Sequence, residues 1–157
     1  MNTGFFKTSF LALALWLFSF SANADDIANF SGHWVASSGK VTSTIGLTDT
    51  CSRVEIVIEQ TADQLITKSY KSDCNRYGSK WGPVTEILKN GKVYEDENEV
   101  GTIDSTTMTT KSADGATAYL YNLQLTKEAS GTIALKSVYG AQSSVGTITT
   151  EATLTRQ

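Results

Sequence analysis

The sequence has little of the residue types on which many enzymes and metal sites depend. It contains one histidine, His33, and two cysteines in 157 residues. A zinc site needs more histidine or free cysteine than this chain offers. A serine or cysteine nucleophile would have to use His33 as its base, and no Gly-x-Ser-x-Gly motif accompanies it. We therefore expect no metal and no cofactor, and we favour a protein that is not an enzyme.

Charged residues are also scarce, and positive charge is not in excess. They make up 18% of the chain, below the usual quarter or so, and the net charge is −3. A mildly acidic domain repels polyanions, so nucleic acid is not an expected partner. Hydrophobic residues make up 40% of the chain, which is enough to build a core and excludes a disordered protein.

The longest apolar run stands at the N-terminus. Lys7 precedes the run 10–20, and the small residues Ala22 and Ala24 follow it around Asn23. This order is typical of a signal peptide, and the run is shorter than the roughly 20 residues that cross a membrane. We predict that residues 1–24 are a signal peptide. Residues 25–157 would then form one domain, periplasmic or secreted, with no membrane span in the mature chain.

Export permits a disulfide, and Cys51 and Cys74 are the pair available for one. They flank two strand-like segments, 53–60 and 64–72, which a short turn joins. If these segments form a hairpin, the two cysteines face one another within the distance that a disulfide requires. A register shifted by one residue would instead pair charged residues of opposite sign, and a bulge near one end would satisfy both. We predict a Cys51–Cys74 bond.

Alternation with a period of two dominates the rest of the chain, and no segment of useful length has helical periodicity. Turn signals such as Asn90-Gly91, Asp114-Gly115 and Ser130-Gly131 separate the alternating segments. The pattern predicts an all-β fold, a single antiparallel up-and-down barrel of about eight to ten strands, with a small β-sandwich as the alternative. The expected strands are 33–38, 40–47, 53–60, 64–72, 82–89, 92–96, 100–103, 106–111, 117–127, 132–139 and 145–156.

The strand expected at 117–127 places aromatic and aliphatic residues on one face. Tyr119, Tyr121 and Leu123 share that face, and Tyr70 falls on the apolar face of another strand. Aromatic and aliphatic walls are usual in small-molecule pockets. We therefore predict that these four residues bind a ligand inside the barrel. A filled core is the alternative interpretation of the same residues.

The segment Phe30-Ser31-Gly32-His33-Trp34 resembles the Phe-x-Gly-x-Trp opening of calycins, the lipocalin, fatty-acid-binding and avidin-like barrels. The resemblance implies a small barrel in which the first-strand tryptophan plugs the closed end. It also implies that a basic residue of the last strand stacks on that tryptophan. Here the pair would be Trp34 and Arg156, in a cation–π contact.

Two acidic features of the sequence bear on calcium binding and on glycoside hydrolysis. The segment 95–99, hereafter the acidic turn, lacks the bidentate glutamate of a calcium loop, so we interpret it as a hairpin turn. Glu86 and Glu95 oppose each other across the Asn90-Gly91 hairpin. A catalytic carboxylate pair would suit glycoside chemistry, but we interpret these residues as strand ends in water.

The leading hypothesis is an exported, non-catalytic β-barrel that binds a small, mainly apolar ligand. The first alternative is an envelope module that binds or inhibits an exported protein through the acidic turn. The remaining alternatives are a hydrolase and an outer-membrane barrel. The latter is disfavoured because few segments reach about ten residues and no aromatic girdles are evident.

Overall fold

The computed structural model describes residues 27–111, 119–141 and 146–157. The predicted signal peptide (residues 1–24) and the Asp114-Gly115 turn lie outside the described residues. In the part of the chain that the structure describes, no helix is long and apolar enough to cross a membrane. The strands found there are β1 (Gly32–Ala36), β2 (Gly39–Ser43), β3 (Thr48–Gln60), β4 (Gln64–Cys74), β5 (Ser79–Trp81), β6 (Val84–Lys89), β7 (Lys92–Glu95), β8 (Asn98–Ile103), β9 (Thr107–Lys111), β10 (Tyr119–Lys127), β11 (Ile133–Ala141) and β12 (Thr147–Arg156).

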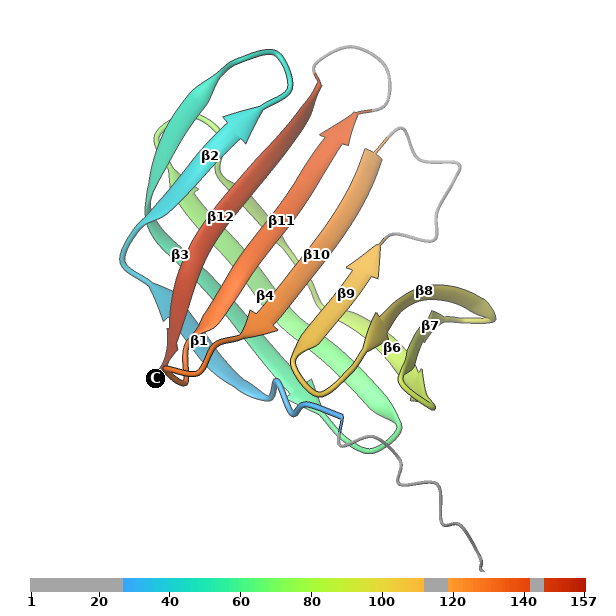
Figure 1. Cartoon of the computed structure of the whole chain (residues 1–157). Coiled ribbons are helices and arrows are strands. Elements are labelled where there is room, and N and C mark those ends of the chain that lie inside the picture. Colours follow the sequence, from blue (N-terminus) through green and yellow to red (C-terminus); the bar gives the residue numbers. More distant parts are fainter. Residues whose placement is uncertain (1–26, 112–118, 142–145) are drawn as a thin grey trace, which may run out of the picture.

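The twelve described strands belong to one antiparallel sheet that closes into a ring (Figure 1). Consecutive strands pair from β6 to β12, and β4 joins β3 to β6. Both β1 and β2 lie between β12 and β3, at successive heights, and together they close the ring. This confirms the predicted all-β antiparallel fold.

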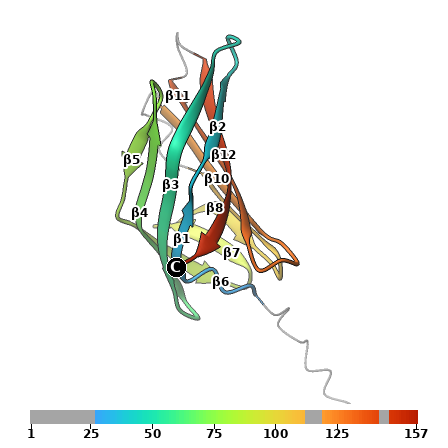
Figure 2. The same cartoon turned by 90° about the vertical axis from the view of Figure 1, so that its left-hand side faces the viewer.

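Two positions of the ring each hold two short strands. One position holds β1 and β2, and the other holds β5 and β6, which pair with successive parts of β4. The twelve strands therefore occupy ten positions, because two positions are filled twice. Figure 2 shows β6 and β7 toward the end of the ring at which the C-terminus lies.

The core lies inside the ring, where the predicted alternation places it. Val54, Ile56 and Ile58 of β3 are buried, and the residues between them are more exposed. Leu123 and Leu125 of β10 are buried in the same core cluster. Burial of one side chain in two along each strand is what the alternating sequence pattern predicts.

Cys51 and Cys74 form the predicted disulfide. They face each other across β3 and β4, and the register then shifts by one residue so that Glu55 faces Lys71. The register shifts back by one residue between Val57 and Ile58. The irregularity next to Cys51 satisfies both the cysteine pairing and the charge pairing, as the sequence suggested. The bond is consistent with an oxidising compartment.

Trp34 and Arg156 lie opposite each other on β1 and β12. The Trp34 indole N–H donates a 2.9 Å hydrogen bond to the Phe30 carbonyl oxygen. Arg156 pairs with Trp34 across β12 and β1, and its guanidinium carbon lies 5.8 Å from the indole ring centroid. A Cβ atom at Gly32, whose φ is 145°, would lie 2.9 Å from Arg156 Nε. The positive φ favours glycine here, because residues with a side chain rarely adopt it.

The turns between β6 and β8 follow their sequence signals. Asn90 and Gly91 have φ angles of 52° and 73°, as the predicted type I′ turn requires. The acidic turn joins β7 to β8, and within it Asp96 also has a positive φ of 53°. These tight turns hold β6 and β7 in the register that sets the positions of Glu86 and Glu95.

Candidate functional site

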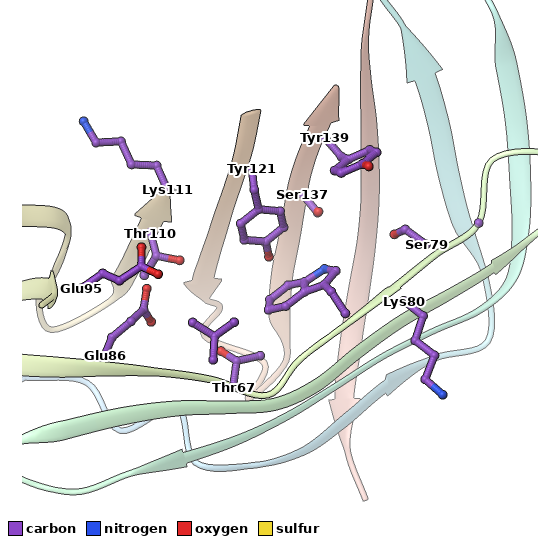
Figure 3. Close-up of a pocket in the computed structure, with 13 residues that line it drawn as sticks. Thr67, Ser79, Lys80, Glu86, Glu95, Thr110, Lys111, Tyr121, Ser137 and Tyr139 are labelled. Carbon is purple, nitrogen blue, oxygen red and sulfur yellow. The ribbon is translucent and has the colours of Figure 1, made fainter. Parts of the chain in front are cut away.

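A cavity of about 500 Å³ lies within the ring. Its walls come from β4 to β7 on one side and β9 to β11 on the other, and Figure 3 shows Glu86 from the first side and Tyr121 from the second directed into the space between them. Small-molecule sites generally measure about 300–1,000 Å³, so this cavity has the size of a ligand site.

The apolar part of the wall is aromatic. Trp81 of β5 and Tyr121 of β10 both line the cavity, with ring centroids 4.4 Å apart and planes at 65°. Tyr70 of β4 lies behind Trp81 and stacks on it at 5.2 Å. Such contacts are favourable beyond the area they bury, so they fix the orientation of the Trp81 indole.

Among the described residues, three buried polar side-chain atoms have no hydrogen-bond partner, and all belong to this aromatic group. They are the hydroxyls of Tyr70 and Tyr121 and the indole nitrogen of Trp81. Buried polar groups are normally paired, because an unpaired one costs about 1–3 kcal/mol.

Glu86 of β6 brings a carboxyl group to the cavity wall. Its exposed fraction is only 5%, and it makes no hydrogen bond or ion pair with any residue that the structure describes. Burial, and secondarily the charge of Glu95, raise its pKa to about 7. Figure 3 shows the two carboxyl groups pointing toward one another. The interpretation of Glu86 as a strand end in water is therefore wrong.

The physical reason is the register of the β6–β7 hairpin. Ile87 faces Tyr94 across it, so Glu86 and Glu95 fall at opposing positions as the sequence indicated. Glu86 also shares the inward face of β6 with Leu88, which is buried. The hairpin thus turns both carboxylates toward the interior of the ring rather than toward solvent.

Tyr121 remains a hydrogen-bond donor in this environment. Burial raises the pKa of its hydroxyl well above the usual range, and nearby Tyr70 and Glu86 raise it further. The neighbouring Ser137 side chain lowers the pKa of Tyr121, but by less than burial raises it. Tyr121 is therefore neutral throughout the pH range in which Glu86 titrates.

The four predicted ligand residues occupy different surroundings. Tyr121 lines the cavity, and Tyr70 supports its wall from behind. Leu123 packs in the core, away from the cavity lining. Tyr119 lies in β10 opposite Ala141, but its side chain lies outside the described residues.

Trp81 and Glu86 are two of the wall residues that the sequence analysis did not assign to a ligand site. Trp81 lies in β5, a three-residue strand between Gly78 and Gly82. The strand is too short for an alternation of apolar and polar residues to predict it. Glu86 had a usable signal, because Val84, Glu86 and Leu88 alternate as one face of a strand. A carboxylate between two inward-facing apolar residues predicts a buried charge.

His33 lies on another part of the ring. Its Nε2 atom is 2.7 Å from Oε1 of Glu55, whose second oxygen accepts a 2.9 Å hydrogen bond from Arg53 Nε. Arg53 first, and also His33, lower the pKa of Glu55. Among the described residues, no group of three histidine, cysteine, aspartate or glutamate side chains has the geometry to hold a metal.

No protein-family model matches the chain, and no curated protein matches it significantly. The cavity is therefore interpreted from its own geometry and chemistry. Its elements are an aromatic wall, small hydroxyl side chains and a pair of carboxylates.

Proposed function

We propose that the protein is an exported, non-catalytic β-barrel that binds a small, mainly apolar molecule inside its ring. The observation that carries the proposal is the cavity of about 500 Å³ walled by Trp81, Val84 and Tyr121. Small hydroxyl residues, Thr110 and Ser137, complete the wall without filling it. Apolar surface with a few placed polar groups is the usual composition of a binding pocket.

The calycin-like character of the barrel belongs to the same proposal. The contact of Arg156 with Trp34, and the position of Gly32 beside it, support a closed end of the kind that the resemblance implies. The predicted signal peptide and the Cys51–Cys74 bond support export. An exported barrel with one closed end is suited to carry or sequester a small molecule.

A protein-binding role for the acidic turn has less support. Glu95 lines the cavity, and Glu99 pairs with Lys92 at 2.6 Å. Asp96 and Glu97 are then the exposed carboxylates left to contact a basic partner. Two residues on one tight turn make a small contact surface compared with a typical protein interface.

Filling the cavity tests the proposal. Ser137→Phe places a large ring at a buried position of the wall, so it should weaken binding of the neutral fluorescent probe N-phenyl-1-naphthylamine by about tenfold or more. The wild-type protein should enhance the probe's fluorescence, and titration gives both affinities.

Lys136→Phe is the matched control, because Lys136 is the exposed neighbour on β11. It adds the same ring outside the cavity and should leave the affinity unchanged. Far-ultraviolet circular dichroism establishes that both variants are folded. Equal affinity of wild type and folded Ser137→Phe, or no probe binding by wild type, would contradict the proposed function.

A further inference from the structure

We propose that the ligand of this cavity is a small organic cation: its ammonium group faces Glu86 and Glu95, and its apolar body lies against Trp81 and Tyr121. This inference rests on the proposed function and names the chemical class of the ligand. It follows from three independent observations: a buried carboxylate to which no described residue bonds, the placement of the lysines and the aromatic wall.

The first observation is that Glu86 is buried at the cavity surface without a partner. With 5% exposure it has lost most of its hydration, and no described residue bonds to it. A buried carboxylate is costly unless an opposite charge and hydrogen bonds compensate it. Glu95 adds a second negative charge to the same wall. A cation that enters the cavity supplies the compensation.

The second observation is that the lysines of the wall do not compensate the charge of Glu86. Lys80 of β5 and Lys111 of β9 are exposed, and Figure 3 shows both side chains directed away from the carboxylates. The remaining ionisable residues of the wall are Tyr121 on β10 and Tyr139 on β11. From β4 the wall takes Thr67, which carries no charge. The charges that face the cavity interior are therefore negative.

The third observation is the aromatic wall itself. Trp81 and Tyr121 present neighbouring rings, and the face of a tryptophan is the best aromatic partner for an ammonium or its adjacent carbons. The favoured chemistry is thus an amine or quaternary ammonium on an apolar body.

The titration of Glu86 gives this binding a pH dependence. Because its pKa is about 7, Glu86 gains its charge between about pH 6 and pH 8. An amine with a higher pKa stays protonated over that range, so cation affinity should rise with pH. Tyr121, whose pKa burial holds well above its usual range, stays neutral over the same range.

The experiment compares three probes of nearly the same shape: 2-phenylethylamine, 2-phenylethanol and phenylacetate. At about pH 8 they are a cation, a neutral molecule and an anion, and isothermal titration calorimetry gives the affinity of each. We expect wild type to bind the amine about tenfold or more tightly than the alcohol, and phenylacetate most weakly. The preference for the amine should shrink several-fold at about pH 5.5.

Glu86→Gln should reduce this preference to about threefold or less, mainly by weakening the binding of the amine. Glu97→Gln is the control, because it removes the same charge from the exposed acidic turn. It should keep the preference.

Equal binding of amine and alcohol by wild type overturns the cation proposal and leaves the proposed function standing. An equal loss of preference in both variants overturns it as well, since general surface charge then explains the preference. If wild type binds none of the three probes and also fails to bind N-phenyl-1-naphthylamine, the proposed function falls with it.

Discussion

Glu86→Gln should stabilise the protein by about 3 kcal/mol at pH 8 and leave its stability unchanged near pH 4. The pKa of Glu86 is about 7 in the folded protein, against an ordinary value of 4.5. Each unit of difference between the folded and unfolded states corresponds to about 1.4 kcal/mol. Glutamine has nearly the shape of the protonated carboxyl group, so it retains the packing and removes the titration.

Whether stability rises or falls with pH depends on whether the folded or the unfolded state holds the proton of Glu86 more tightly. Below about pH 4.5 the carboxyl is protonated in both states and contributes nothing. Between about pH 4.5 and 7 the unfolded chain has lost the proton and the folded protein has kept it, so the free energy of unfolding falls. Above about pH 7 the full cost is present. Wild type should therefore lose stability over this window through Glu86, and Glu86→Gln should not.

Urea unfolding at a series of pH values measures this difference. Glu95→Gln should recover a smaller part of the stability, because burial is the larger cause of the raised pKa and Glu95 the smaller one. Glu97→Gln, on the exposed turn, is the control and should change little. A stability difference between Glu86→Gln and wild type that is the same at pH 4 and pH 8 would contradict the prediction.

Reduction of the Cys51–Cys74 bond should destabilise the protein by about 3 kcal/mol without changing its fold. The cysteines are 23 residues apart in sequence, and a cross-link of this span restricts the unfolded chain by about that amount. The folded protein keeps its register, because the β3–β4 ladder runs on to Gln60 and Leu65. The melting temperature should fall by about 10 °C.

Reduced wild-type protein measures the effect of the bond better than a double alanine variant does, because it keeps both sulfur atoms in place. Cys51→Ala with Cys74→Ala also removes buried volume, since Cys51 is 3% exposed, and should melt at a still lower temperature. Thermal unfolding with and without reductant measures the cross-link alone. If reduced and oxidised protein melt together, the bond does not stabilise the fold.

Much of the fold could be predicted because its signals are local. Val54, Ile56 and Ile58 alternate with more polar residues, and their burial follows directly. Asn90 and Gly91 adopt the positive φ angles for which those residue types are suited. The ring has more strands than expected, because two of its positions are each filled by two short strands, which alternation alone does not reveal.

The cavity was harder to predict, because its wall joins residues whose proximity depends on ring closure. Trp81 stands in a three-residue strand next to a Gly-Pro pair, a context that indicates a turn. Tyr121 was expected to face inward, but alternation does not distinguish its cavity position from the packed position of Leu123. Whether an inward face is filled or open depends on side chains from the opposite strands.

The most direct test of the central claim is the intact mass of the purified protein under native conditions. We expect the wild-type chain, beginning at Asp25, to carry an added mass of a small molecule that is lost on denaturation. The Ser137→Phe variant, with its cavity filled, should show the chain mass alone. Wild-type protein that shows the bare chain mass, indistinguishable from Ser137→Phe in occupancy, would contradict the claim that the ring holds a ligand.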